Sequence, residues 1–176
     1  MASLEEQLVK YLTDAHALEQ NVARQLDTMI QTTEDAELKS HFEHHKLETE
    51  RHKTALEQRL EAHGASPSAV KQAGQVVAAM GAGAADIARK DNAGKNARDA
   101  FISEHTEIAA YELLERVANF AGDAQTVEVA RRNRADEEAM AKKIADSWDR
   151  VALLSLQDEG VDIAEIAGRI PGGNAA

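Results

Sequence analysis

The chain of 176 residues carries 31 acidic and 20 basic side chains, which gives a formal net charge of −11 at pH 7. This excess of negative charge repels phosphate backbones and anionic lipid, so nucleic acids and membrane surfaces are poor partner candidates and metal cations are better ones. The chain has no cysteine, which excludes disulfides, thiol nucleophiles and thiolate metal sites and leaves oxygen and imidazole as the available metal ligands.

The composition favours helices over strands. Two prolines and six aromatic residues stand in a sequence rich in Ala, Glu, Leu, Gln, Arg and Lys. We expect a single all-α domain, because this length is sufficient for one core. The first residues lack a basic start followed by an apolar core, and no stretch is long enough to span a bilayer. The simplest expectation is a soluble cytoplasmic protein.

The first expected helix begins after Ser3 and extends to about Ile30. Ser3 and Glu6 form a capping-box pattern, and apolar residues follow at alternating gaps of three and four. Glu19 falls on this apolar stripe, where an unpaired charge is costly. His16, three residues earlier, is expected to point partly outward.

The second expected helix covers about residues 35–63. Thr33 can cap its start, and Gly64 followed by Pro67 ends it. The apolar positions along this helix recur at gaps of four and three and include two histidines, so imidazole groups are expected to face the core. These positions are Leu38, Phe42, His45, Thr49, His52, Leu56 and Leu60.

Two further helices are expected after a change of composition. Residues of about 66–98 are rich in Ala and Gly, which is typical of a crossover segment. The apolar pattern then predicts a third helix over about 97–121, and Asp123 can cap a fourth helix that continues to Gly160. Residues 161–176 are expected to form a short C-terminal tail.

Two helical hairpins joined by one long crossover are the connectivity of ferritin-like bundles. An up-down-up-down bundle would need a short middle loop instead. The sequence therefore predicts an all-α, ferritin-like four-helix bundle over residues 1–160, with the crossover between its second and third helices.

One acidic residue on each long helix lies at nearly the same distance from a hairpin loop. Glu19 lies 14 residues before residue 33 and Glu48 lies 15 residues after it. Glu107 and Glu137 lie 15 residues before and after Gly122. At a rise of ~1.5 Å per residue, both pairs lie ~20 Å from their turns. The four carboxylates are therefore expected to meet in the middle of the bundle.

Like charges in a core must be relieved by protonation, basic partners or bound cations. Divalent metals fit this arrangement best, because carboxylates from four helices with histidines one turn away hold two iron or manganese ions in bundle cores. His45 precedes Glu48 by three residues and His52 follows it by four, so both can supply imidazole. A dinuclear metal site is the first hypothesis.

The same acids allow a metal-free alternative. Arg51 lies three residues after Glu48, and Arg134 lies three residues before Glu137, so each acid has a possible partner within its own helix. A structural ionic layer would result. In that case the chain would be a helical dimer that acts by binding a partner.

Four segments, DAHALEQ, HHKLETERH, EHTEIAAYELLERVA and RADEEAM, resemble in order and spacing the ferritin-like family of bacterial stress proteins typified by YciF and YciE. The resemblance covers about residues 5–150, and its most specific part is the E-H-x-E-I-A-x-Y run of the third expected helix. The matching residues are Glu19; His45, Glu48 and Thr49; Glu104, His105, Glu107, Ile108, Ala109 and Tyr111; and Asp136 with Glu137.

The resemblance implies a helical bundle related to rubrerythrins and bacterioferritins, commonly a homodimer, with a candidate dinuclear centre of iron or manganese. It adds Glu104, one turn from Glu107, to the acids of the centre. The sequence departs from the ferritin-type pair of Glu followed three residues later by His, because these positions hold Arg51 and Met140. The candidate metal ligands are Glu19, His45, Glu48, His52, Glu104, Glu107 and Glu137.

The expected function is that of a ferritin-like stress-response protein whose di-iron or di-manganese centre reacts with O₂ or peroxide. If the chain is an enzyme, it is a di-metal oxidoreductase of the ferroxidase, peroxidase or catalase type. Tyr111, one turn beyond Glu107, is either a hydrogen-bond donor to the ligands or an ordinary core residue.

Overall fold

The computed structural model describes residues 2–65 and 92–166, and all regular secondary structure in these ranges is helical. This confirms the all-α prediction. A short 3₁₀ helix at Ile163–Glu165 ends the described chain. The described ranges contain five α-helices: α1 (Leu4–Thr32), α2 (Ala36–Ala62), α4 (Asn92–Ala121), α5 (Ala124–Asp146) and α6 (Trp148–Asp158).

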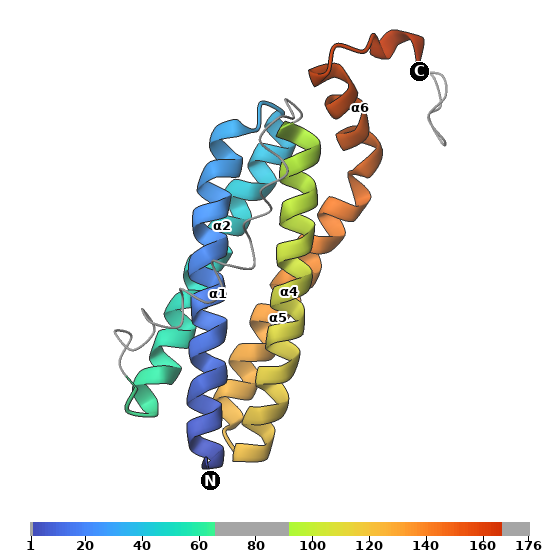
Figure 1. Cartoon of the computed structure of the whole chain (residues 1–176). Coiled ribbons are helices and arrows are strands. Elements are labelled where there is room, and N and C mark those ends of the chain that lie inside the picture. Colours follow the sequence, from blue (N-terminus) through green and yellow to red (C-terminus); the bar gives the residue numbers. More distant parts are fainter. Residues whose placement is uncertain (1, 66–91, 167–176) are drawn as a thin grey trace.

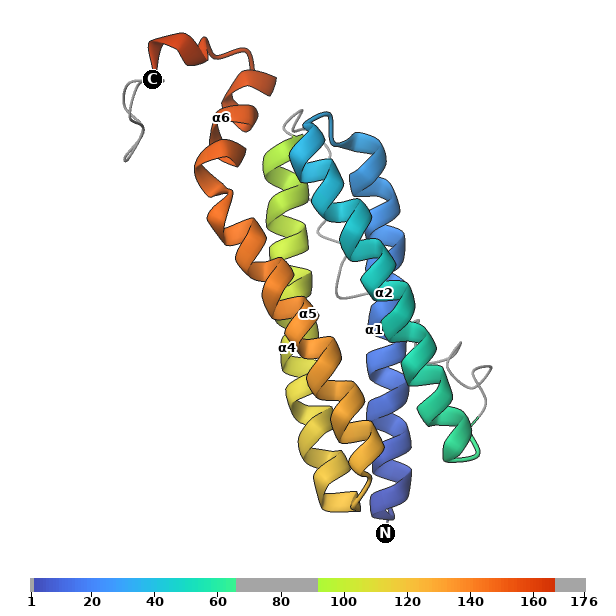
Figure 2. The ribbon, with the colours of Figure 1, turned by 180° about the vertical axis from the view of Figure 1, so that it is seen from behind.

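The four long helices form two antiparallel hairpins that pack into one bundle (Figure 1). Residues 33–35 connect α1 to α2, and Gly122 with Asp123 connects α4 to α5. α1 packs on α4 and α2 packs on α5, while α2 and α4 run in the same direction (Figures 1 and 2). Two hairpins arranged in this way have the predicted ferritin-like connectivity.

The start of the second hairpin differs from the prediction. Of the crossover expected at about 66–98, residues 66–91 lie outside the described residues, and the rest is already helical in α4. Asn96 lies in the early part of α4, which the sequence predicts as part of the crossover. Its side-chain amide donates hydrogen bonds of 2.9 Å to the hydroxyls of Thr32 and Thr33, which hold this part of the helix in place. The first turns of α4 are therefore attached to the end of α1.

The fourth expected helix is interrupted, so the prediction of one helix to Gly160 is wrong. α5 ends before Ser147, whose hydroxyl donates a hydrogen bond of 2.8 Å to the carbonyl of Ile144. A serine side chain that bonds to the backbone in this way competes with helical hydrogen bonds. α6 then packs on α4, and Arg150 of α6 forms a 2.6 Å ion pair with Asp35, the N-cap of α2.

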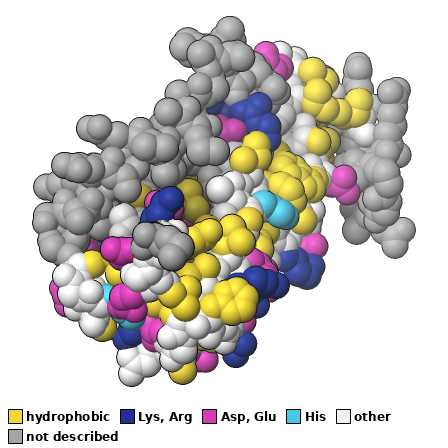
Figure 3. All heavy atoms as spheres, turned by 60° about the horizontal axis from the view of Figure 1, so that its bottom comes forward, with side chains coloured by type: hydrophobic (Ala, Val, Ile, Leu, Met, Phe, Trp, Pro, Cys, Tyr) yellow, Lys and Arg dark blue, Asp and Glu magenta, His cyan; other side chains and the backbone are white. Residues whose placement is uncertain are grey.

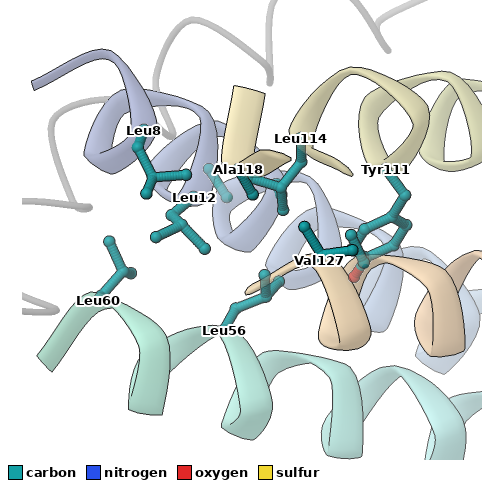
Figure 4. Packing of buried hydrophobic residues seen from close by; sticks show 11 residues of the cluster. Leu8, Leu12, Leu56, Leu60, Tyr111, Leu114, Ala118 and Val127 are labelled. Carbon is teal, nitrogen blue, oxygen red and sulfur yellow. The ribbon is translucent and has the colours of Figure 1, made fainter. Parts of the chain in front are cut away.

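Two clusters of buried apolar side chains fill the bundle, and a polar region separates them. The first cluster lies toward the α4–α5 loop (Figure 4) and includes Leu8, Leu12, Leu56, Leu60, Tyr111, Leu114, Ala118 and Val127. The second lies toward the α1–α2 loop and includes Val22, Leu26, Met29, Leu38, Phe42, Met140 and Ile144. The order along α1 is therefore apolar, then Glu19, then apolar again.

The surface of the bundle mixes charged and apolar side chains. On the face shown in Figure 3, hydrophobic side chains gather among acidic and basic ones. On α4, Ile102, Leu113 and Phe120 are exposed, so they contribute to the apolar part of the surface. In the described part of the chain, no helix combines the length and the hydropathy needed to cross a bilayer.

Asp123 joins the α4–α5 loop to the end of α2. Its carboxylate caps α5 by accepting a 3.1 Å hydrogen bond from the backbone N–H of Thr126. It also accepts bonds of 2.9 and 3.0 Å from Arg59 and contacts the ring of His63 at 2.8 Å. Burial alone would raise the pKa of Asp123, but the hydrogen bonds that it accepts lower it below the usual value of 3.8.

The substitution Asp123→Ala is expected to lower the free energy of unfolding by about 2 kcal/mol at pH 7, because it removes both a helix cap and an ion pair. Since folding lowers the pKa of this carboxyl, its contribution is present above pH 3.8 and is lost as the pH falls. Urea denaturation at pH 7 measures the loss. Asp123→Asn is the matched control, because it keeps the capping oxygen and should lose roughly half as much.

Candidate metal centre

A layer of polar side chains crosses the middle of the bundle between the two apolar clusters. Each of its residues is no more than 2% exposed. Where a helix contributes two of them, they lie three, four or seven positions apart, which are the spacings that share one helix face. This polar layer consists of Glu19 from α1, His45 and His52 from α2, Glu104 and Glu107 from α4, and Asn133 and Glu137 from α5.

Four residues of the polar layer form a first group, in which each residue offers one ligand atom within 4.8 Å of the others. The imidazole Nε2 of His45 lies 3.0 Å from Glu104 Oε2 and 3.2 Å from Glu137 Oε2. Glu107 completes the group from the next turn of α4. The first group therefore combines one nitrogen ligand with three carboxylates.

In a second group, Glu19, His52 and Glu137 likewise each offer one ligand atom within 4.8 Å of the others. Here the Nδ1 atom of His52 lies 3.2 Å from Glu19 Oε1 and 2.9 Å from Glu137 Oε1. Glu137 is thus common to both groups, and it turns Oε2 toward His45 and Oε1 toward His52. A carboxylate in this position can bridge two neighbouring cations.

The carboxyl groups on α4 are kept from ionising by their surroundings. Burial, followed by the charges of neighbouring glutamates, raises the pKa of Glu107 well above 4.5. Burial also raises the pKa of Glu104 to about 8, although the contact with His45 opposes the rise. In the metal-free layer these groups therefore favour the protonated form at neutral pH.

Glu137 has the opposite behaviour because it touches both histidines. Burial would raise its pKa, but the contacts with His45 and His52 lower it to about 2. Burial likewise would lower the pKa of each histidine, but contacts with carboxylates raise the pKa of His52 to about 10 and also raise that of His45. Without metal, these contacts favour the carboxylate form of Glu137 and the imidazolium form of both histidines.

The donor atoms of the polar layer fit a hard or borderline divalent cation. Among the described residues, ten oxygen and nitrogen atoms of the polar layer are buried without a hydrogen-bond partner, and several of them meet only the opposing groups of the ion pairs given above. Buried polar atoms of folded proteins are nearly always paired, so this concentration of unpaired atoms needs a cause. Carboxylate oxygens together with imidazole nitrogens are ligands suited to iron and manganese.

The arginines named in the metal-free alternative do not reach the polar layer. Arg51 is 67% exposed, and its guanidinium lies 3.6 Å from Glu48. Arg134 forms ion pairs with Glu112, Glu115 and Glu138, and none with Glu137 three residues later. The positive charges of the metal-free layer are therefore those of its two histidines.

The position of Glu48 differs from the expected meeting of four acids. Its side chain is 12% exposed, and it lies in neither of the two groups. Glu48 Oε2 is 3.2 Å from His45 Nδ1, the ring nitrogen that faces away from Glu104. Glu48 lies at the expected depth along the bundle, beside His45. The rotation of α2 about its axis, however, points His45 and His52 into the core and leaves Glu48 at the edge of it.

Tyr111 has both of the roles considered for it. Its ring belongs to the first apolar cluster, and its hydroxyl donates a hydrogen bond to Glu19 Oε1. The same hydroxyl accepts a 3.0 Å bond from the amide of Asn133. Burial, then the charge of Glu19, raises the pKa of Tyr111 well above 10. This tyrosine therefore stays protonated and orients Glu19.

Two buried polar residues were missed or misplaced by sequence reasoning. Asn133 falls four residues before Glu137 on the core face of α5, and this spacing is the signal that could have revealed it. The expectation for His16 is wrong, because its ring is fully buried and its Nε2 lies 2.9 Å from Glu57 Oε1 on α2. The α1–α2 interface covers that side of α1.

The chain is similar to several known proteins. A family model described as "Domain of unknown function (DUF892)" matches residues 3–156. A solved structure from Xanthomonas campestris has a TM-score of 0.75 and 23% identity, and the match covers 91% of this chain and 100% of that one. The Escherichia coli stress protein YciF has a TM-score of 0.64 and 19% identity, with coverage of 92% and 100%.

A third similar structure is a two-domain protein from Anabaena variabilis that contains DJ-1/ThiJ/PfpI-like and ferritin-like domains. It matches with a TM-score of 0.63 and 18% identity, over 99% of this chain and 42% of that chain. Together with YciF, it supports the ferritin-like bundle that the sequence predicts.

Proposed function

Since the chain belongs to the DUF892 family, and its fold is ferritin-like, we propose that it binds two iron or manganese ions in the polar layer of its four-helix bundle. The observation that carries the proposal is the shared position of Glu137, which turns one oxygen toward each of two groups of ligand atoms. If the polar layer served only to balance charge, its ligand atoms would not need to form two adjacent groups that share one carboxylate.

The ligands divide between the two ions as follows. His45, Glu104 and Glu107 would hold one ion, Glu19 and His52 would hold the other, and Glu137 would serve both. Two adjacent redox-active ions, when bound, supply electrons for the reduction of O₂ or peroxide. The chain would then act as a di-metal oxidoreductase of the ferroxidase, peroxidase or catalase type, in a bacterial stress response.

The protein's own contribution is to hold the ligands in a dry and ordered layer. Apolar clusters on both sides exclude bulk water from it. The hydroxyl of Tyr111, itself held by Asn133, keeps the carboxylate of Glu19 in place. Ordered ligands lose little conformational entropy on binding, which favours metal affinity.

Anaerobic titration of the purified chain with Fe(II) or Mn(II) tests the proposal, and about two ions per chain are expected. His45, His52 and the protonated carboxyls must lose protons before they can bind metal, so uptake at pH 7 should release about two or more protons per chain. Calorimetry in buffers of different ionisation enthalpy measures this release. For the same reason, occupancy should fall as the pH is lowered.

A folded chain that takes up neither ion under these conditions would contradict the proposal. It would favour a second candidate, a metal-free helical protein that binds a partner. The observation behind this candidate is the contact of both imidazoles with Glu137, which balances charge without metal. The homodimer and the cytoplasmic location remain predictions under either candidate.

A further inference from the structure

We propose that Glu48 and Asp136 are positioning residues, each of which holds the outer nitrogen of a histidine so that the inner nitrogen faces the metal centre. The proposal rests on the proposed function, because it assigns a role around the same centre. It gives Glu48 a role other than that of a direct ligand.

The two histidines are each held between acids on opposite sides of the ring. For His45, Nε2 faces Glu104 and Glu137 in the polar layer, and Nδ1 lies 3.2 Å from Glu48 Oε2. In His52 the two ring nitrogens have the opposite roles. Its Nδ1 faces the layer, and its Nε2 lies 3.1 Å from Asp136 Oδ2.

The two outer acids share a location and differ from the acids of the polar layer. Glu48 comes from α2 and Asp136 from α5, and their side chains are 12% and 33% exposed. Arg51 lies near both of them, at 3.6 Å from Glu48 and 3.8 Å from Asp136. They therefore line the solvent side of the α2–α5 contact, where their carboxylate oxygens can accept hydrogen bonds.

A neutral imidazole that gives one nitrogen to a metal carries its proton on the other nitrogen. An acceptor for that proton determines the tautomer and the ring orientation, and losing the acceptor commonly weakens metal binding. The contacts in this chain therefore assign opposite tautomers. His45 is expected to bind through Nε2 with its proton directed to Glu48, and His52 through Nδ1 with its proton directed to Asp136.

Zn(II) is a suitable probe, because it is diamagnetic and does not react with O₂. In ¹⁵N-labelled wild-type protein loaded with Zn(II), imidazole spectra should show His45 with a protonated Nδ1 and His52 with a protonated Nε2. Competition with a chelator measures the affinity. Glu48→Leu and Asp136→Leu should each weaken Zn(II) binding by about 10- to 100-fold and disturb the tautomer of the adjacent histidine.

Conservative variants and a surface control separate positioning from general damage. Glu48→Gln and Asp136→Asn keep an acceptor oxygen, so they should retain the wild-type tautomers and most of the affinity. Glu50→Gln changes an exposed acid of the same helix that pairs with Lys53, and it should leave both readouts unchanged. Wild-type affinity and tautomers in both leucine variants would overturn this inference alone. Failure of the wild-type chain to bind Zn(II), Fe(II) and Mn(II) would overturn the proposed function with it.

Discussion

Replacing Glu107 with glutamine is expected to stabilise the metal-free protein and to impair its metal binding. The free energy of unfolding should rise by about 1–3 kcal/mol at pH 7, because each unit by which folding raises the pKa of a carboxyl costs ~1.4 kcal/mol when the unfolded chain is ionised. Glutamine has nearly the same shape and carries no ionisation cost. It is also a poor ligand in place of a carboxylate.

The pH dependence of this gain has a definite sign. Folding raises the pKa of Glu107 above 4.5, so its contribution to stability is fully present below pH 4.5 and is lost as the pH rises through the folded-state value. The advantage of Glu107→Gln should therefore be small at pH 4 and large at pH 7. Urea denaturation of chelator-treated protein at both pH values measures it. Glu128→Gln, at an exposed position of α5, is the control and should stay within about 0.5 kcal/mol of wild type.

A Glu107→Gln variant that is less stable than wild type at pH 7 would contradict the assignment of Glu107 as a strained carboxyl. A gain in stability with unchanged metal content would contradict its role as a ligand instead. The two measurements thus test the electrostatics and the ligand assignment separately. A gain in stability together with a loss of binding is the pattern of a residue kept for function.

The same substitution at Glu137 is expected to have the opposite effect on stability. Glu137→Gln should lower the free energy of unfolding of the metal-free protein by about 3 kcal/mol at pH 7, because the contacts with His45 and His52 hold the pKa of Glu137 at about 2. Since this pKa is lowered from 4.5, the contribution is present above pH 4.5 and is lost as the pH falls toward 2. Denaturation at pH 7 measures the loss.

Metal content provides the second readout for Glu137. Because this residue belongs to both groups, Glu137→Gln should abolish the binding of both ions. Glu19→Gln is the matched comparison, because Glu19 belongs to the second group alone and its loss should leave about one ion per chain. Elemental analysis after anaerobic loading counts the ions. Equal metal content in the two variants would contradict a bridging Glu137.

The contrast between the two glutamates comes from their neighbours. Glu137 forms an ion pair with an imidazole on each side, at 3.2 and 2.9 Å, whereas Glu107 forms no ion pair with any described residue. Removing one partner of a buried ion pair is costly. A buried carboxyl without a charged partner instead takes up a proton on folding, which lowers the free energy of unfolding at pH 7. In the metal-free protein, ion pairs are therefore expected to stabilise Glu137, whereas Glu107 is expected to lower the free energy of unfolding.

Much of the fold could be predicted from local signals. The Ser3–Glu6 capping box forms as expected, with a 2.7 Å bond from Ser3 N to Glu6 and a 3.1 Å bond from Glu6 N to Ser3. All the apolar-seam residues predicted for α2, including His45 and His52, are buried. The family match and the similarity to YciF confirm the resemblance that the motifs suggested. Each of these signals lies within a few turns of one helix.

The differences arise where distant parts of the chain meet. The first turns of α4 form earlier than expected because Asn96 bonds to Thr32 and Thr33 at the end of α1, more than 60 positions away. The end of α5 is the exception, because Ser147 interrupts the helix through a local bond to Ile144 while the apolar pattern continues. His16 and Asn133 are buried because the neighbouring helices cover them. No periodicity within one helix contains this information.

The sequence by itself determined the helices, their buried faces and the depth at which the acids lie, because helical period and rise are properties of a single helix. Only the tertiary structure decided which ring nitrogen of each histidine faces the centre, that Glu48 lies behind His45, and that Glu137 touches both His45 and His52. The physical reason is that depth depends on rise alone, whereas the atoms that meet depend on how each helix is rotated against its neighbours, which packing determines.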